Sequence, residues 1–531
     1  KEKERKEKET EKEKIEAIEI PHVVKKIVLP ETLGIKKKRL IYPLVPRNPE
    51  PNDRVFAYVK IYWNRNLGKY VYEVVEPPLN DKLEALIEKI KDLLEQKLDI
   101  DFSKIKKVEA ERYLTEKIEE TINYFKFVLT EDEKDILKYY IKRDFLGLGK
   151  IEPLMQDPNI EDISCDGLNI PIFVFHRDPG IGSVMTNVVF YDREELDSFI
   201  VRLAQLCGKS ISVSEPLVDG TLPDGSRLQA TLGSDIARKG SNFTIRKFTE
   251  KPLTPVHIIN YGTADSRLLA YLWMAVDYGR SMLICGGTAS GKTSLLNVLS
   301  LFIRPERKIV SIEDTAELRL PHPHWVPSVA REVIATEREK VDMFALLKES
   351  LRQRPDYIIV GEVRGKEAYI LFQQISTGHP ALATIHAENM ERLVDRLTTP
   401  PISLSPSLIA GLDVLIFIQK VRRGESYARR ITEVLEMIKF EEGKRLPTVN
   451  KIFSWNPFTD KFEIGGKSYL LKKISMENGI PEEEIREEYK RRVLVLEWMR
   501  KNNISDYKDV FKVLNIYYTS PSRMLSVITS D

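Results

Sequence analysis

The sequence predicts an α/β protein whose carboxyl-terminal part is a mainly parallel sheet covered by helices on both faces. Short apolar runs, rich in β-branched residues, alternate there with helical segments, which is typical of parallel sheets. The runs are SMLIC, KIVSIE, YIIVGE, ALATIH and DVLIFIQ. Smaller α/β domains are expected before this part. The stretch TEKPLTPVHIINYGTAD, with two prolines and a glycine, is expected to join them as a flexible linker.

Changes in composition divide the chain into five expected segments. Residues 1–15 form a tail made almost only of charged side chains, which cannot be buried. An accessory α/β region is expected over 16–128 and a further α/β domain over 129–250. The linker covers 251–264. The domain with the parallel sheet covers 265–531 and ends in a helical extension.

The amino-terminal elements are predicted from periodicity and from cap residues. A helix is expected in LNDKLEALIEKIKDLLEQKLDI, capped by Asn80 or Asp81. One helical stretch is expected from about 108 to 148, and REELDSFIVRLAQLCG predicts a helix that stops at Gly208. The run LVDGTLPDGSRLQATL predicts a hairpin that turns at its Asp-Gly pair.

Composition excludes several classes of protein. The 531 residues hold 82 Lys and Arg against 80 Asp and Glu, so a net charge of +2 gives no bulk attraction to nucleic acid. Cys165, Cys207 and Cys285 lie far apart, which excludes a four-cysteine zinc module and favours a reducing, intracellular setting. No apolar run of 18 residues or more predicts a transmembrane helix, so a membrane role is expected to pass through a partner.

The stretch CGGTASGKTS, residues 285–294, matches the phosphate-binding pattern G-x-x-x-x-G-K-[ST] between a strand and a helix. Backbone amides of such a loop point at phosphate oxygens, and the helix amino terminus adds partial positive charge. Lys292 is expected to reach the β- and γ-phosphates, and the hydroxyl of Thr293 to hold Mg²⁺. The residues expected to bind the nucleotide are Gly286, Gly287, Thr288, Ala289, Ser290, Gly291, Lys292, Thr293 and Ser294.

A carboxylate at the end of another buried strand predicts hydrolysis. In PDYIIVGEVRG the apolar run ends at Gly361, and Glu362 follows at the sheet edge where ligands bind in such folds. Many P-loop proteins have Asp directly after the apolar run, so the Gly-Glu ending is a departure. We expect Glu362 to activate the attacking water, although a solvated glutamate at a strand end would give the same pattern.

A second group of carboxylates follows the strand in IVSIEDTAEL. Glu313 is expected to help position the nucleophile, and Asp314 could hold Mg²⁺ through water, with Glu317 in the same cluster. Alternatively, Asp314 or Thr315 only caps a turn.

Two of the seven histidines bracket one strand in STGHPALATIHAEN. His386, at the end of that strand, is expected to contact phosphate. His379, which precedes the strand, could be a packing residue.

Together, GGTASGKT, SIEDTAEL, PDYIIVGEVRG and STGHPALATIHAEN resemble the Walker A, Asp box, Walker B and His box of the type II/type IV secretion ATPase superfamily. The Gly-Glu ending is usual in that family. The resemblance covers roughly residues 150–420. The archaeal branch looks closest, with its archaellum motor and pilus-assembly ATPases.

The resemblance implies a homohexameric ring of RecA-like P-loop NTPase domains that hydrolyses Mg-ATP. It implies that Arg227 and Arg246 of the preceding domain reach the phosphates, although surface ion pairs would also explain them. It further implies a cytoplasmic motor, held at the membrane by a polytopic platform protein and filament-assembly components. Archaellum, pilus and secretion use stay open.

Two other functions remain possible from the residues alone. RecA-like rings also move nucleic acid, but the balanced charge and the lack of a basic-aromatic stripe disfavour a translocase. A scaffold that binds ATP without turnover is disfavoured by the intact Glu362. In the helical extension, Ile485, Leu496 and Met499 recur at helical spacing, which predicts core packing or a subunit contact.

Overall fold

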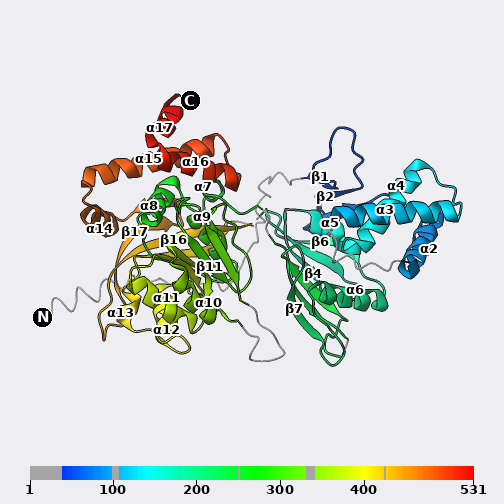
Figure 1. Ribbon diagram of the computed structural model, residues 1–531, viewed down its shortest axis with the longest axis horizontal. Coiled ribbons are helices and arrows are strands. Elements are labelled where there is room, and N and C mark those ends of the chain that lie inside the picture. The colour runs from blue at the N-terminus through cyan, green and yellow to red at the C-terminus, as the bar shows by residue number, and fades with distance from the viewer. Residues whose placement is uncertain are drawn as a thin grey trace, which may run out of the picture.

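The computed structural model describes residues 39–97, 107–178, 180–233, 235–248, 251–330, 341–423 and 426–530. The charged tail predicted over 1–15 lies outside them. Two nine-stranded sheets organise the chain, each with its own apolar core (Figure 1). We call residues 39–248 the amino-terminal part and residues 251–530 the carboxyl-terminal part.

The first sheet is almost wholly antiparallel and has the order β1-β2-β3-β6-β5-β4-β9-β8-β7. The parallel pair β3–β6 joins its two halves. Its strands are β1 (Leu40–Val45), β2 (Ala57–Asn64), β3 (Lys69–Val75), β4 (Ile160–Cys165), β5 (Pro171–His176), β6 (Ser183–Val189), β7 (Leu217–Thr221), β8 (Arg227–Thr231) and β9 (Asn242–Arg246). The domain boundary expected at residue 128 stays a prediction. Residues on both sides of it belong to one sheet and one apolar core.

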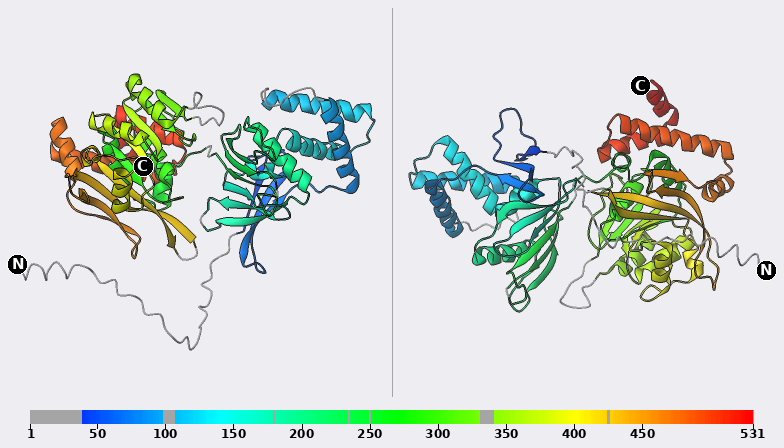
Figure 2. Two further views of the ribbon diagram at one scale, coloured as in Figure 1. Left: turned by 90° about the horizontal axis from the view of Figure 1, so that it is seen from below. Right: turned by 180° about the vertical axis from the view of Figure 1, so that it is seen from behind.

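Helices cover this sheet and extend beyond it. They are α2 (Asp81–Lys97), α3 (Lys107–Tyr124), α4 (Glu131–Phe145), α5 (Glu152–Gln156) and α6 (Arg193–Leu206). Helices α2 to α4 lie on the side away from the carboxyl-terminal part (Figure 2). Asn80 caps α2, because its Oδ1 accepts a hydrogen bond of 2.8 Å from the amide of Leu83.

The single helical stretch expected from 108 to 148 is wrong, because it is two helices. Thr130 begins α4 with a capping box, in which its hydroxyl accepts from the amide of Glu133 and its own amide donates to the Glu133 carboxylate. This reciprocal pair satisfies two amides that a continuous helix would have bonded internally, so the chain restarts at Thr130.

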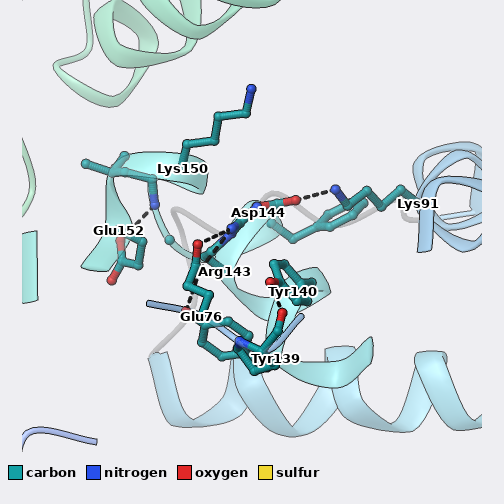
Figure 3. Close-up of polar contacts among 12 residues, drawn as sticks. Glu76, Lys91, Tyr139, Tyr140, Arg143, Asp144, Lys150 and Glu152 are labelled. Atoms are coloured by element: carbon teal, nitrogen blue, oxygen red, sulfur yellow. Dashed lines mark hydrogen bonds and ion pairs between the residues drawn. The ribbon is translucent and has the colours of Figure 1, made fainter. Parts of the chain in front are cut away.

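A polar cluster ties α2 and α4 to the end of β3 (Figure 3). Arg143 donates to Glu76, 3.0 Å away, and to Asp144, 2.7 Å away. Tyr139 donates to the same Glu76 carboxylate at 2.7 Å, and Lys91 of α2 pairs with Asp144. Because these charges are largely buried, each requires its partner, and the helices are held to the sheet in one arrangement.

The second sheet has the order β12-β11-β13-β14-β10-β15-β16-β17-β18. The first six strands in this spatial order, from β12 across to β15, are parallel to one another. The predicted mainly parallel sheet is therefore confirmed. The parallel edge strand β12 and the antiparallel strands β16 to β18 were not predicted. Its strands are β10 (Met282–Cys285), β11 (Ile309–Glu313), β12 (Trp325–Val329), β13 (Tyr357–Val363), β14 (Ala381–Ile385), β15 (Val414–Arg423), β16 (Ser426–Lys439), β17 (Thr448–Asn456) and β18 (Lys461–Ile464).

Helices cover both faces of this sheet, as predicted. Met282 and Ile284 of β10 point into a core with α8 and α9, whereas Leu283 and Cys285 point into the opposite core with α10 to α13. The helices are α7 (Pro255–Asn260), α8 (Ser266–Asp277), α9 (Lys292–Ser300), α10 (Met343–Ser350), α11 (Glu367–Ser376), α12 (Met390–Thr398), α13 (Pro406–Ile409), α14 (Tyr469–Asn478), α15 (Glu482–Lys501), α16 (Tyr507–Thr519) and α17 (Pro521–Ser530).

Part of the expected linker is packed. Val256 and Ile258 of α7 are buried in the core with α8, because the helix turns its apolar side toward it. The predicted helix α15 forms, and its Leu496 and Met499 enter the same core. Within the described ranges, no helix combines the length and the apolar composition needed to cross a membrane.

Candidate nucleotide site

The loop between β10 and α9 has a backbone that side chains would obstruct. A Cβ at Gly286 would lie 2.3 Å from the carbonyl oxygen of Ile418. Gly291 precedes α9 with a φ of +96°, and Ala289 has a φ of +56°, both in the left-handed region. The loop therefore turns sharply from strand to helix, and leaves α9 with unbonded amides at its amino terminus.

Lys292 is buried at the start of α9 and points back over the loop. Its Nζ donates to the carbonyl oxygen of Gly287 at 2.9 Å and lies 3.4 Å from Nδ1 of His386. Burial lowers the pKa of Lys292, and the nearby carboxylate of Glu362 opposes this effect. The ammonium therefore lies over the loop backbone, and among the described residues no carboxylate forms an ion pair with it, which suits an anionic ligand.

Glu362 lies near the end of β13 between two basic side chains. Its Oε2 accepts a hydrogen bond of 2.7 Å from Arg364, and its Oε1 is 3.1 Å from Nε2 of His386. The His386 contact is within ion-pair range but is not aligned as a hydrogen bond, so Oε1 has no aligned donor among the described residues. Burial alone would raise the pKa of Glu362, but Arg364 in particular brings it below its ordinary value.

Glu313 is the last residue of β11 and contacts the segment that follows this strand. Its Oε1 accepts hydrogen bonds from the amides of Glu317, at 2.9 Å, and Leu318, at 3.0 Å. Burial raises the pKa of Glu313 to about 7, although these two amides oppose the shift. The carboxyl group thus shapes the segment after β11, and the catalytic role expected for it stays a prediction.

Asp314 makes the turn contact that was one of its two expected roles, and its Mg²⁺ role stays a prediction. Its Oδ1 accepts from the amide of Thr315 at 2.9 Å, which is a local turn contact. Its Oδ2 lies 3.0 Å from Arg364, the same guanidinium that holds Glu362. Arg364 therefore joins the two groups of carboxylates.

Arg364 and Arg429 lie at the site but were not among the residues predicted from the sequence. Arg364 follows Glu362 by two residues in the same motif, and this short spacing was the available signal. Arg429 of β16 donates to the carbonyl oxygen of Ala289 at 3.3 Å, and its Cδ would lie 3.0 Å from a Cβ at Gly291. Nothing local marks Arg429, because the pairing of β15 with β16 brings it to the loop.

The two histidines lie at opposite ends of β14. His386 follows the strand and contacts Lys292 and Glu362, so the structure brings it into the site; its contact with phosphate stays a prediction. His379 precedes the strand and lines a cavity of about 510 Å³ with Asp277 and Arg307 at the other edge of the sheet. This position fits packing better than phosphate binding.

The two predicted arginines are neighbours on paired strands of the amino-terminal part. Arg227 of β8 is opposite Arg246 of β9. Arg227 lies 3.8 Å from Asp219, and Arg246 lies 4.0 Å from Glu317 in the segment after β11. Arg246 therefore reaches the carboxylate segment of the other part, and the phosphate role of both arginines stays a prediction.

The residues present fit a triphosphate with Mg²⁺. The bare backbone of Gly286 and Gly291 leaves room that a Cβ would fill. Within the described part of the chain, one buried oxygen of Glu362 has no aligned donor. Thr293 and Asp314 would supply the oxygen ligands that Mg²⁺ prefers. Among the described residues no three His, Cys, Asp or Glu side chains gather as a metal cage, and P-loop proteins need none, since the phosphates share the ion.

A strand, a glycine-rich loop and a helix at the carboxyl edge of a mainly parallel sheet define the carboxyl-terminal part as a RecA-like P-loop NTPase domain. The family model described as "Type II/IV secretion system protein" matches residues 172–504, more than half of the chain. The chain therefore belongs to the type II/IV secretion system protein family.

The chain is also similar to individual proteins. An uncharacterized protein of Methanocaldococcus jannaschii is 38% identical over 397 residues, which are 74% of this chain and 71% of that protein. The type IV secretion system protein PtlH of Bordetella pertussis is 28% identical over 280 residues, 45% of this chain and 80% of its own. The VirB11 ATPase of Brucella suis matches with 24% identity and a TM-score of 0.28, over 54% of this chain and 96% of its own.

Proposed function

We propose that this chain is a Mg-ATP-hydrolysing motor that works as a homohexamer. It would power the assembly or rotation of a pilus-like filament, such as an archaellum or a pilus, or a related secretion step. Its partners would be a polytopic membrane platform protein and filament-assembly components, with the motor on the cytoplasmic side of the membrane. Membership of the type II/IV secretion system protein family supports this proposal.

The observation that carries the proposal is the joint placement of Lys292, His386 and Glu362. Lys292 and Glu362 lie on either side of the His386 ring, with contacts of 3.4 Å and 3.1 Å. A binding loop alone would need only the lysine. A carboxylate kept ionised beside it provides a base for water, which favours hydrolysis over nucleotide-gated scaffolding.

Each side chain would have one task in the reaction. Lys292 would leave the carbonyl of Gly287 and hold the β- and γ-phosphates. Glu362 would orient the attacking water and accept its proton, while His386 would contact the γ-phosphate. Arg227 and Arg246 would approach the phosphates from the amino-terminal part. Mg²⁺, when bound near Thr293, would neutralise negative charge on the phosphate oxygens.

Phosphate release by the purified protein with Mg-ATP tests the proposal. Glu362→Gln should keep ATP binding and slow hydrolysis by about 100-fold or more, because the base is lost. Lys292→Ala should lose both. Glu349→Gln and Lys348→Ala, on the exposed side of α10, are matched controls that should behave as wild type. Normal turnover in Glu362→Gln would refute the role of this base.

A second measurement separates the motor from a nucleic-acid translocase. The balanced charge of the chain predicts weak binding to single- and double-stranded DNA. Tight binding whose affinity falls steeply with salt would favour the translocase instead.

A further inference from the structure

We propose that Arg319 is a positioning residue of the nucleotide site: by holding Phe248 of the amino-terminal part, it keeps Arg246 directed at the carboxylate segment after β11. This inference rests on the proposed function, because it assigns Arg246 its phosphate role. The contact joins the two parts of the chain close to the place where they are connected.

The position of Arg319 follows from the residues on either side of it. Leu318 and Leu320 are both buried in the core with α8 and α9. Since side chains alternate in an extended segment, Arg319 between them is exposed and points outward. Its guanidinium lies 4.2 Å from the ring centroid of Phe248, a cation–π contact.

The backbone of this segment is tied to the nucleotide site at two points. The Glu313 carboxylate accepts from the amides of Glu317 and Leu318. The amide of Arg319 donates to Oδ1 of Asn297 at 2.8 Å, and Asn297 is buried on α9, the helix that begins at Lys292. A movement of α9 or of Glu313 on nucleotide binding would therefore shift the backbone of Arg319.

Contacts within the amino-terminal part fix the position of Phe248. Its amide donates to Oγ of Ser226 at 3.0 Å, and its ring lies against the turn at Gly225, where a Cβ would be 3.1 Å from Cγ of the ring. Lys247, next to it, donates to the carbonyl oxygens of Leu154 and Asp157. The chain from 246 to 248 thus has little freedom of its own.

The direction of Arg246 follows from these anchors. With Phe248 against Arg319, Arg246 lies 4.0 Å from Glu317, a long ion pair that is half exposed. Such a pair is worth little by itself, so it is not what holds the parts together. The Arg319–Phe248 contact is the better-anchored one, and the Arg246 guanidinium is left available for a phosphate.

A double-mutant cycle tests the positioning role. We expect Arg319→Met and Phe248→Leu each to lower kcat about fivefold to tenfold. The KM for ATP and the affinity for a fluorescent ATP analogue should change less than about twofold. Phe248→Tyr keeps the ring and should retain wild-type kcat. If Arg319 acts through Arg246, adding Arg319→Met to Arg246→Met should cause no further loss.

The matched control is Arg352→Met, because Arg352 is exposed and pairs on the surface with Glu349 at 3.8 Å. It should leave kcat unchanged. Wild-type kcat in Arg319→Met would overturn the inference. The inference would also be overturned if the loss in kcat of the double variant Arg246→Met/Arg319→Met equalled the product of the two single losses.

A distance measurement keeps the inference testable without turnover. Spin labels at Val213 and Tyr369, both exposed, report the separation of the two parts in a Cys207→Ser background diluted with unlabelled protein. Arg319→Met should broaden the distance distribution, and Arg352→Met should not. An unchanged distribution in Arg319→Met would overturn the inference, whereas a wild-type protein that releases no phosphate would overturn the proposed function.

Discussion

Gly361 of β13 lies so close to Glu313 of the neighbouring strand β11 that a Cβ at position 361 would be 3.1 Å from Cγ of Glu313. The Gly-Glu ending of β13 therefore has a packing reason. An aspartate at 361 would compete with the buried Glu313 for the same space, so the carboxylate that faces the site is placed one residue later, at Glu362.

Gly361→Ala should push the Glu313 side chain aside. We expect a loss of about 1–3 kcal/mol in unfolding free energy, typical of overpacking a filled core, together with weaker hydrolysis. Thermal unfolding and phosphate release measure the two effects. In a Glu313→Ala background the same glycine substitution should cost much less; an equal cost in both backgrounds would contradict the contact.

Arg364→Met should impair hydrolysis while ATP binding persists. The substitution removes the 2.7 Å hydrogen bond to Glu362 and the ion pair to Asp314. A charge-assisted hydrogen bond is worth about 1.5–3 kcal/mol, so kcat should fall by at least about tenfold. Steady-state kinetics and analogue binding separate the two parameters. A kcat equal to that of Arg352→Met would show that Arg364 does not orient the base.

Lys247 should make stability depend on pH above neutrality. Burial lowers the pKa of Lys247 to about 8, below the usual value of about 10.4 in unfolded chains. Between these values the unfolded chain binds more protons, so the unfolding free energy contributed by this group rises with pH, by up to about 3 kcal/mol.

The difference in unfolding free energy between wild type and Lys247→Met isolates this contribution. It should increase in favour of wild type from pH 8 to about 10.4. Denaturant unfolding at several pH values measures it. A difference that stays constant across this range would mean that Lys247 has an ordinary pKa in the folded protein.

Arg492→Met should destabilise the carboxyl-terminal part severely. Arg492 of α15 and Asp277 at the end of α8 pair at 2.5 Å, with both side chains at most 3% exposed. The substitution takes Arg492 away from Asp277, which keeps its pair with Arg304, and from Glu488, 2.9 Å away. Each of these charge-assisted contacts is worth about 1.5–3 kcal/mol. Arg486→Met, which removes only exposed pairs on the same helix, should cost less than about 1 kcal/mol.

Urea unfolding compares the two arginine variants. Equal midpoints would show that α15 is not part of the same cooperative unit as α8.

Local patterns predicted five of the six parallel strands and the strand-loop-helix order around Lys292. The strands β10, β11, β13, β14 and β15 each follow from a short apolar run, because a strand buried on both faces needs apolar residues at successive positions. The helix break at Thr130 was missed, although its capping box is local. The strands β16 to β18 were missed because charged and polar residues are mixed with the apolar ones in their runs.

The residues of the candidate site also divide into those that local patterns predict and those that they do not. The sequence by itself determined which residues end the buried strands and begin α9, since strand order and loop chemistry place Lys292, Glu362 and His386 at one edge of the sheet. Packing of the whole chain brings Arg429 to them and Arg319 to Phe248. Contacts between distant segments depend on strand pairing and on packing of the whole chain, which no local pattern encodes.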